Sequence, residues 1–204
     1  IELINYCDEI GITFLSSVFS IADAKLLIEL GCTEVKIPSF ESRNRKLISF
    51  CDEHFDTIFM STGTSTLQEI EKSIKSMSLN TCWVLMHCVS TYPCEPKQAN
   101  IPKMKKLMKV TNSCWGRIIG YSDHIQGVES AKVAIGEGAK VIEKHFTVDN
   151  NLPGRDNKFA ILPHEMKDLT DYIKMREDMF ISHGYGFQES EADSRKNYAG
   201  RFNG

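Results

Sequence analysis

Short apolar runs alternate with longer amphipathic stretches along the whole chain, and few folds accommodate this alternation. The short runs have the length and composition of strands, which we expect near residues 12–16, 33–37, 57–61, 82–88, 117–121 and 140–145. The intervening stretches repeat apolar residues at helical spacing, and we expect helices near residues 2–9, 22–30, 43–53, 67–74, 101–111, 127–136 and 163–181. Because parallel strands need helical crossovers, this order predicts a parallel α/β sheet.

Two parallel architectures fit such a pattern, a doubly wound open sheet and a (β/α)8 TIM barrel. A doubly wound sheet usually carries a Gly-rich phosphate loop after its first strand, and this chain has no Gly-x-Gly-x-x-Gly. Polar residues instead follow almost every predicted strand, which is how barrel active sites are built. The sequence therefore favours the barrel.

A complete barrel needs eight strand-helix units, and the pattern shows six. The chain also opens inside a predicted helix and without an initiator Met. We therefore expect residues 1–185 to form an incomplete TIM barrel that lacks its first two units. The strands near 12–16 and 140–145 would then have unpaired edges, which make a chain marginally stable or prone to aggregation.

Charge and cysteine content exclude several classes of protein. The 204 residues include 24 Lys and Arg against 27 Asp and Glu, a net charge of −3 that gives no reason to expect nucleic-acid binding. No apolar run approaches the roughly 20 residues of a membrane span, and no basic signal region is visible. Seven cysteines without a Cys-x-x-Cys spacing indicate reduced thiols, so we expect a cytoplasmic protein.

His124 and His145 each end one of two consecutive predicted strands. Neighbouring strands lie about 4.8 Å apart, so side chains at matching levels can converge on one cation. Strand alternation places Ser122 on the face of His124 and Glu143 on the face of His145. Two imidazoles with open positions suit Mn²⁺ or Mg²⁺ as a Lewis acid better than a closed zinc site. The alternative is a satisfied histidine at one strand end and a surface histidine at the other.

Lys36 is directed into the barrel interior by strand alternation and must find an anion there. One reading pairs it with a neighbouring carboxylate such as Glu143. The other has it bind the phosphate or carboxylate of a small substrate, helped by the hydroxyls of Ser39, Ser61 and Ser122. The Ser-Thr-Gly-Thr turn that begins at Ser61 leads into a helix N-terminus, which attracts anions, although such a turn is also an ordinary helix cap.

Three further expectations concern residues near these strands. Asp156 follows the last predicted strand and either hangs over the histidine site or is a solvated loop acid. His87 lies inside a strand-like run and is expected to be a packed core residue. A zinc cluster of Cys82, His87, Cys88 and Cys94 is conceivable, but its spacing matches no finger or ribbon.

Five motifs, in chain order, closely resemble the sialic acid synthase family. They are Lys36-Ile37-Pro38-Ser39, Ser61-Thr62-Gly63, His87-Cys88-Val89-Ser90-Thr91-Tyr92-Pro93, Gly120-Tyr121-Ser122-Asp123-His124 and Ile142-Glu143-Lys144-His145-Phe146-Thr147. The likeness extends over roughly residues 11 to 180. It implies a (β/α)8 transferase of carbohydrate biosynthesis. Such enzymes condense phosphoenolpyruvate with an N-acetylated hexose, usually of mannosamine type, to a nine-carbon 2-keto acid and phosphate.

The resemblance also implies roles for individual residues. His124 and His145 would hold the divalent metal, Glu41 would sit beside the reacting centre, and Tyr92 and Asp156 would face the sugar. The residues implied to bind phosphoenolpyruvate are Ser17, Lys36, Ser39, Ser61 and Ser122, and Ser90 occupies a substrate-binding position that is Asn or Ser among relatives. The metal would polarise the sugar aldehyde for attack by the methylene carbon of phosphoenolpyruvate, after which water adds at the enol carbon and phosphate departs.

The chain also departs from the family pattern. Arg155-Asp156-Asn157 stands where the family usually has Pro-Asp-His, so legionaminic-type and pseudaminic-type acceptors stay open beside N-acetylmannosamine. The family's first two strands carry an acidic residue and a second phosphoenolpyruvate-binding lysine, and neither strand is found here. Residues 186–204 resemble the start of a linker to the family's C-terminal antifreeze-like domain, which covers the partner's site in a homodimer.

These departures leave three functional readings. The first is a sialic acid synthase-type enzyme whose 204 residues alone have little or no activity. The second is another barrel aldolase or phosphoenolpyruvate-using synthase. The third is an inactive fragment that binds a sugar or a metal.

Overall fold

A computed structural model describes residues 1–75, 77–78, 80–110 and 118–201 of the chain. They form one parallel sheet in the order β1-β2-β3-β4-β5. Its strands are β1 (Glu34–Ile37), β2 (Thr57–Ser61), β3 (Cys82–Cys88), β4 (Ile119–Asp123) and β5 (Val141–Lys144). Each strand pairs in parallel with the next one along the chain. The prediction of a parallel α/β sheet is confirmed, and strands occur near five of the six predicted positions.

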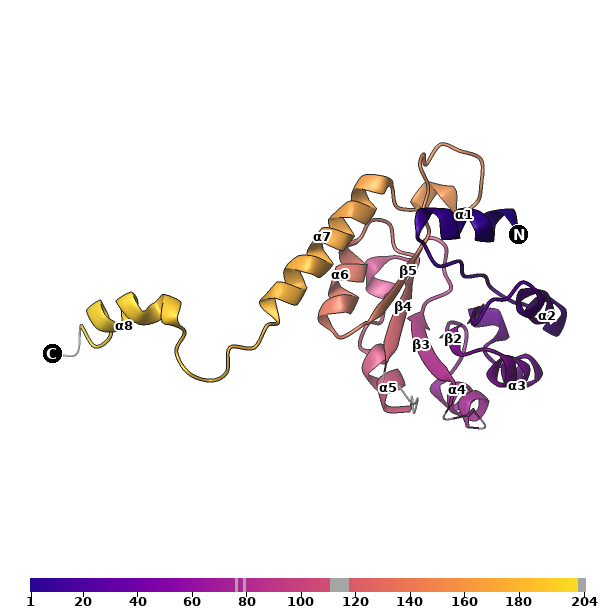
Figure 1. Cartoon of the computed structure of the whole chain (residues 1–204), viewed down its shortest axis with the longest axis horizontal. Helices are drawn as coiled ribbons and strands as arrows, with labels where there is room; N and C mark the ends of the chain where they lie inside the picture. Colours follow the sequence, from indigo (N-terminus) through magenta and orange to yellow (C-terminus); the bar gives the residue numbers. More distant parts are fainter. Residues whose placement is uncertain (76, 79, 111–117, 202–204) are drawn as a thin grey trace.

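A helix follows each strand and lies on the outer side of the sheet (Figure 1). These helices are α3 (Arg45–His54), α4 (Leu67–Ile74), α5 (Lys103–Val110), α6 (Glu129–Gly136) and α7 (Pro163–Met179). Two helices precede the sheet, α1 (Glu2–Ile10) and α2 (Ile21–Glu29), and α8 (Ala192–Asn197) belongs to the C-terminal tail. Residues 111 and 117, where we expected a helix to end and a strand to begin, lie outside the described residues.

The strand expected near residues 12–16 does not form. Instead, Ser17 makes an isolated parallel bridge with Lys36. The Lys36 N–H donates to the Ser16 carbonyl and the Val18 N–H donates to the Lys36 carbonyl, both at 3.0 Å. The segment then leaves the edge of β1, because the Ser20 side chain accepts from the Asp23 N–H and starts α2. The expectation of six strands was therefore wrong for the described residues, which form a five-stranded partial barrel.

The sheet is strongly curled, as a contact between its two edge strands shows. Lys36 on β1 and Glu143 on β5 form an ion pair with 3.1 Å between Nζ and Oε2. In a flat sheet four strand spacings would separate these strands by about 19 Å, further than the two side chains reach when both stand upright. The edges must therefore curve toward each other over a shared interior.

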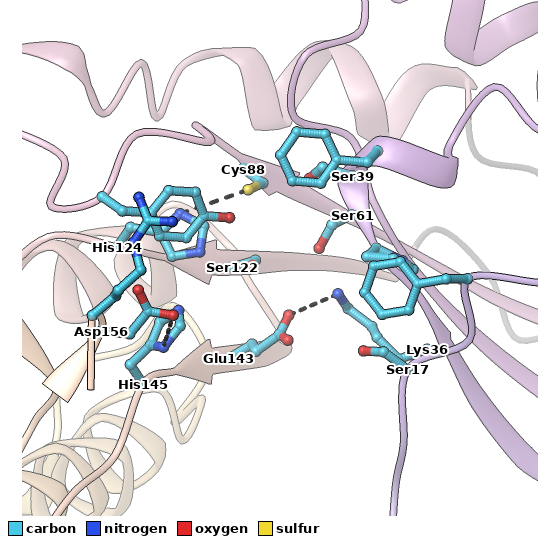
Figure 2. A pocket seen from close by; sticks show the side chains of 15 residues that line it. Ser17, Lys36, Ser39, Ser61, Cys88, Ser122, His124, Glu143, His145 and Asp156 are labelled. Carbon is cyan, nitrogen blue, oxygen red and sulfur yellow. Dashed lines mark hydrogen bonds and ion pairs between the residues drawn. The ribbon is translucent and has the colours of Figure 1, made fainter. Parts of the chain in front are cut away.

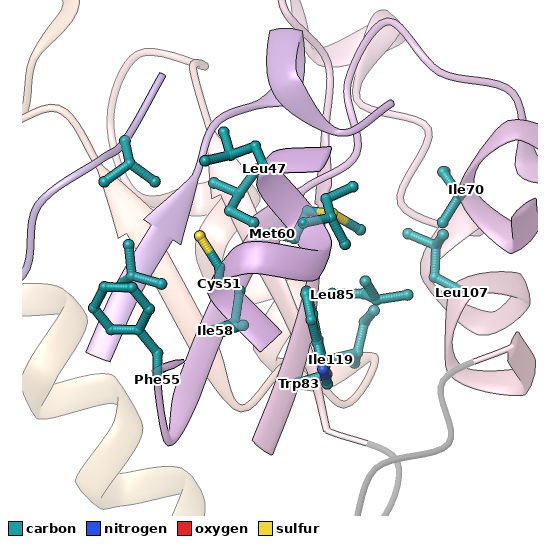
Figure 3. Packing of buried hydrophobic residues seen from close by; sticks show 14 of the residues in the cluster. Leu47, Cys51, Phe55, Ile58, Met60, Ile70, Trp83, Leu85, Leu107 and Ile119 are labelled. Atoms are coloured by element: carbon teal, nitrogen blue, oxygen red, sulfur yellow. The ribbon is translucent and has the colours of Figure 1, made fainter. Parts of the chain in front are cut away.

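The main core lies between the outer face of the sheet and the helices. Figure 3 shows Ile58 of β2 and Leu85 of β3 packing in one cluster with Leu47 of α3 and Ile70 of α4. Each of these side chains is at most 1% exposed, and burying such a side chain contributes about 1.5–3 kcal/mol. The predicted alternation holds, because Val35 and its odd-numbered neighbour Ile37 join this core while Lys36 faces inward.

A smaller apolar cluster fills the barrel interior. It contains Cys82, Val84 and Met86 of β3, with Phe59 and Val141 packed against them. This apolar cluster fills the barrel interior at the amino-terminal ends of the strands. The polar side chains of the interior therefore lie at the carboxyl ends of the strands.

Beyond α7 the chain is exposed, and α8 stands apart from the sheet in Figure 1. Within the described residues, no helix has the length and apolar character needed to cross a membrane.

Candidate active site

A cavity of about 520 Å³ opens at the carboxyl ends of the strands, and Figure 2 shows its lining. Residues from all five strands or the loops that follow them contribute to it. The lining residues are Ser17, Phe19, Lys36, Pro38, Ser39, Phe40, Ser61, Cys88, Tyr92, Ser122, His124, Glu143, His145, Arg155 and Asp156. Most of the residues that the sequence singles out therefore face one space.

Lys36 is 5% exposed and carries the positive charge on one side of this cavity. Its ion pair with Glu143 is the carboxylate pairing that the sequence left open. The Glu143 Oε2 atom nevertheless makes no contact of hydrogen-bond geometry with any described residue, and its side chain is 44% exposed. Since an ammonium has three donors, Lys36 retains donor capacity toward a second anion.

Ser61, at the end of β2, lies beside Lys36. Its hydroxyl is buried and finds no hydrogen-bond partner among the described residues. Figure 2 shows this oxygen directed into the space between Lys36 and Ser122. Leaving a buried hydroxyl unpaired costs about 1–3 kcal/mol, so the position is suited to a ligand oxygen.

Ser39, which follows β1, lies against the turn after β2 and so joins the hydroxyls near Lys36. The Ser39 hydroxyl accepts a hydrogen bond of 3.1 Å from the Gly63 N–H and also contacts the Cys88 thiol; a hydroxyl that accepts in this way can still donate its proton. A Cβ at Gly63 would lie 2.3 Å from the Ser90 Oγ and 2.7 Å from the Ser39 Oγ, so a larger residue here would displace these hydroxyls. The tight packing holds the hydroxyls of this turn in place.

The two histidine rings lie side by side across the cavity from Lys36, with centroids 5.3 Å apart. The Nδ1 atom of His124 is 2.9 Å from the Val89 carbonyl. A carbonyl only accepts, so we infer that Nδ1 carries the proton and that Nε2 keeps its lone pair. Metal-binding histidines are oriented by hydrogen bonds of this kind.

The pKa values of His124 and His145 are shifted in opposite directions. Burial lowers the pKa of His145, and the neighbouring His124 lowers it further. Burial acts in the same way on His124, but contacts with the Cys88 thiol and the Val89 carbonyl outweigh it, so the pKa of His124 is raised. His145 is therefore the more readily neutral imidazole, and acid would compete with any cation for His124.

The donor set fits an open metal site rather than a closed one. Among the described residues, no group of three or more His, Cys, Asp or Glu side chains is arranged to hold a metal ion. The conceivable zinc cluster is thus not formed, since His87 is buried and its Nε2 lies 2.7 Å from the Ala99 carbonyl. Two imidazoles alone leave positions for water and substrate oxygens, as expected for Mn²⁺ or Mg²⁺ used in chemistry.

Aromatic and acidic side chains border the histidines. The Tyr92 ring is 4.1 Å from that of His124 and 6.0 Å from that of His145, between centroids. Asp156 Oδ2 lies 3.7 Å from His145 Nδ1, so the loop acid does hang over the histidines. This side of the cavity combines a ring face with a carboxylate, a pairing suited to a sugar.

Two residues with expected roles do not line the cavity. Glu41 lies in a 3-10 turn (Ser39–Glu41), where its Oε2 accepts a hydrogen bond of 2.8 Å from the Asn44 amide. Ser90 is one layer behind the lining, with its Oγ 3.7 Å from the Cys88 sulfur. Both depart from the expected placement because loop paths, unlike strand faces, have no periodicity that a sequence reveals.

Sequence reasoning gave no role to five lining residues, Phe19, Pro38, Phe40, Cys88 and Arg155, and two of these carry a reactive or charged group. Cys88 and Arg155 face the cavity, and nothing had assigned either to it. Cys88 could have been found, because strand alternation puts it on the same face as Val84 and Met86. Burial raises its pKa, but contacts with His124 and Ser39 outweigh burial, and the net pKa of the thiol is lowered.

Comparison with known proteins decides the family. The model of the NeuB family matches residues 1–184. The chain belongs to the NeuB family. Relatives of this NeuB-family chain are named as legionaminic, pseudaminic and sialic acid synthases, which confirms the resemblance seen in its motifs.

Two relatives show the extent of the match. The chain is 36% identical over 181 residues to an N,N'-diacetyllegionaminic acid synthase of Legionella pneumophila, an alignment covering 86% of the chain and 50% of the relative. It is 33% identical over 200 residues to the enzyme of that name from Campylobacter jejuni, covering 96% of the chain and 58% of the relative. This NeuB-family chain thus spans about half the length of the curated relatives it matches.

Solved structures support the fold. A sialic acid synthetase from Leptospira borgpetersenii, solved with citrate, superposes with a TM-score of 0.86 at 28% identity, covering 97% of the chain and 70% of that protein. A DAHP synthase from Thermotoga maritima superposes with a TM-score of 0.71 at 17% identity, covering 87% of the chain and 54% of that protein. The second likeness concerns the fold alone.

Proposed function

We propose that the complete gene product carrying these residues condenses phosphoenolpyruvate with an N-acetylated hexose of mannosamine type. The products are a nine-carbon sialic-acid-like 2-keto acid and phosphate. One observation carries the proposal: a single cavity places a buried ammonium and an unpaired buried hydroxyl opposite two imidazoles. The half of the cavity around Lys36 and Ser61, the donor half, suits the anionic phosphoenolpyruvate. The half around His124 and His145, the acceptor half, suits a neutral, hydroxyl-rich sugar. Membership of the NeuB family supports the same assignment.

The donor half binds and orients the anion. Lys36 donates to the phosphate or carboxylate of phosphoenolpyruvate, and the hydroxyls of Ser39, Ser61 and Ser122 donate to the remaining oxygens. Ser17, bridged to Lys36 through the backbone, contributes another hydroxyl at the edge of this group. Fixing the donor converts a bimolecular encounter into an oriented one, which can supply several kcal/mol of the rate enhancement.

The acceptor half positions the sugar aldehyde. Tyr92 offers its ring to the sugar, and the Asp156 carboxylate accepts hydrogen bonds from sugar hydroxyls. His124 and His145, which both line the cavity, would hold the cation through ring nitrogens. When bound, Mn²⁺ or Mg²⁺ supplies Lewis-acid polarisation of the aldehyde oxygen. The role of Glu41 stays a prediction, as do the homodimer and the cytoplasmic location.

The bonding changes in the proposed reaction balance without a redox partner. The methylene carbon of phosphoenolpyruvate forms a bond to the aldehyde carbon, and the aldehyde oxygen becomes a hydroxyl. Water adds at the former enol carbon, and the bond to phosphate breaks to leave the 2-keto group. Release of phosphate instead of pyruvate separates this reaction from that of a pyruvate-releasing aldolase.

The decisive experiment assays the complete gene product for phosphate release from phosphoenolpyruvate. A panel of N-acetyl hexosamines serves as acceptors, with and without Mn²⁺. We expect acceptor-dependent phosphate release that His124→Ala and His145→Ala each abolish, because either change removes a ligand of the cation. His54→Ala is the matched control, since His54 is exposed on α3. Unchanged turnover in either cavity variant would remove that imidazole from the metal site.

A further inference from the structure

Asp123 and Lys144 immediately precede the two cavity histidines in the chain. They lie opposite each other in the register of β4 and β5. Because side chains alternate along a strand, both point to the face away from the cavity. There Lys144 Nζ is 3.0 Å from Asp123 Oδ2, with side chains 3% and 0% exposed. Nothing in the proposed reaction uses this buried ion pair.

The pair is the centre of a closed hydrogen-bond network. The Asp123 carboxylate also accepts from the Ser130 hydroxyl at 2.6 Å and from the Ile125 N–H at 2.9 Å. The Lys144 ammonium donates to the Ile125 carbonyl. Both backbone groups of Ile125 are therefore held, one by each member of the pair. The network joins the end of β4, the turn after it, the start of α6 and the end of β5.

Fold stability alone does not explain a charge pair at this place. Removing both charges from water costs about as much as the pair regains, and apolar residues of similar volume often stabilise a fold as well or better. At the adjacent outward positions of the same strands, the rings and chains of Tyr121 on β4 and Ile142 on β5 pack with the main core, and the Tyr121 hydroxyl also interacts with the Asp123 carboxylate. A directional ion pair with further hydrogen bonds fixes the separation of the two strand ends more narrowly than an apolar contact would.

We propose that Asp123 and Lys144 are positioning residues that set the separation of His124 and His145. The pair locks β4 against β5 one residue before both imidazoles branch into the cavity. By holding Ile125 as well, it clamps the backbone on both sides of His124. The Val89 carbonyl then needs only to orient the ring. This inference rests on the proposed metal site and adds residues that act on it from behind the sheet.

The test separates metal affinity from folding, using the complete gene product. In Asp123→Leu/Lys144→Met both charges are replaced together, so that neither remains buried without a partner. We expect this variant to unfold within a few degrees of the native protein but to bind Mn²⁺ at least about tenfold more weakly in calorimetry, the size of effect known for residues that orient metal ligands. Binding of phosphoenolpyruvate measured without metal should stay within about twofold, since Lys36 is untouched.

Two further variants sharpen the comparison. Asp123→Asn/Lys144→Gln keeps hydrogen-bonding groups at both positions and should recover most of the Mn²⁺ affinity. Lys132→Met breaks an ion pair of 2.8 Å with Asp168 on the helices and should leave the affinity unchanged.

Each outcome has a distinct meaning. Native Mn²⁺ affinity in a folded Leu/Met variant would overturn the inference. If the Leu/Met variant does not fold, the Asn/Gln variant is used for the decision. The inference would also be overturned if the Asn/Gln variant folds but its Mn²⁺ affinity is reduced as far as that of a histidine-to-alanine variant. Absence of Mn²⁺ binding by the unmodified protein would instead refute the metal site of the proposed function, and the inference with it.

Discussion

Lys36 shows how one side chain can serve both structure and ligand binding. Its ion pair with Glu143 neutralises a buried ammonium. Glu143 is half-exposed and its Oε2 lacks hydrogen-bond geometry toward Lys36, so the carboxylate can turn to water when a more highly charged anion arrives. The pairing and the anion-binding readings of this lysine are therefore compatible.

Replacing Gly63 by Ala should displace the serine hydroxyls that lie next to it at the cavity. The new Cβ would lie 2.3 Å from the Ser90 Oγ, and overpacking of this kind costs about 1–3 kcal/mol. We expect a lower free energy of unfolding in urea and a higher KM for phosphoenolpyruvate, because Ser39 loses the Gly63 N–H. The control is Gly136→Ala at the end of α6, where nothing lies within 4 Å of the added carbon. Equal stability of the two variants would contradict the geometry.

Arg155 lines the cavity and brings a positive charge to a position where the family usually has Pro. Its guanidinium forms no ion pair with any described side chain, although it lines the cavity next to Asp156. We expect it to donate to oxygens of the acceptor sugar, so Arg155→Ala should raise the acceptor KM by about tenfold, as loss of a charge-assisted hydrogen bond would. Steady-state kinetics should show the KM for phosphoenolpyruvate unchanged.

The matched control lies in the same loop. Lys158 is exposed and absent from the cavity lining, so Lys158→Ala should change neither KM. A rise in the KM for phosphoenolpyruvate in Arg155→Ala would move that arginine to the donor half.

The two faces of the central strand β3 pack against different parts of the fold. All seven of its residues are buried. Trp83 and Leu85 pack with the helices, while Val84 and Met86 fill the interior below the cavity. His87 lies on the helix side, 1% exposed, and its ring stacks on Tyr121 with 5.7 Å between centroids. The expectation of a packed core histidine is confirmed.

His87 should make the fold sensitive to acid. Burial lowers its pKa, and its Nδ1 is buried without a partner among the described residues. The unfolded state, with a pKa of about 6.5, then binds more protons below that pH. The contribution of His87 to stability is therefore fully present above about pH 6.5 and is lost as the pH falls through the lower, folded-state pKa.

Urea denaturation between pH 5 and 8 measures this effect. His87→Gln keeps a donor for the Ala99 carbonyl but does not titrate, so its free energy of unfolding should fall less on acidification than that of the native protein. His54→Gln on the exposed face of α3 should follow the native slope. Identical slopes for His87→Gln and the native protein would contradict the assignment.

The whole molecule is a curled partial barrel with apolar surface outside its core. Helix α1 has no buried residue, and its side chains Leu3, Tyr6 and Ile10 are between 48% and 69% exposed. At the other end, Met179 and Phe180 are 71% and 68% exposed. Large apolar side chains exposed in such numbers on α1 and at the end of α7 are candidates for contact with further protein.

We therefore expect the isolated 204 residues to show little or no turnover and to self-associate. Size-exclusion chromatography and the phosphate-release assay, run beside the complete gene product, measure both properties. Efficient turnover by a monodisperse 204-residue chain would contradict the expectation and show that the cavity needs no further segment.

The periodicity of the chain was sufficient to predict its local structure. A 3.6-residue repeat and a two-residue alternation are properties of neighbouring residues, so α1 to α7, five of the strands and the inward direction of Lys36, His124 and His145 could be predicted from it. Helix α8 was not predicted, because it lies in residues that were expected to form only a linker. The start of α4 is local in the same sense, because Thr66 and Glu69, three residues apart, form a capping box. Family motifs added the expected chemistry, which geometry alone does not name.

Features that rest on contacts between residues far apart in the chain could not be predicted from the sequence. Whether residues 12–16 become a strand depends on a partner for the whole segment, and only Ser17 has one. The Lys36–Glu143 contact depends on how far the sheet coils, and the absence of Glu41 and Ser90 from the cavity lining depends on the path of two loops. Such features arise from the packing of whole layers, for which no single stretch of sequence carries a signal.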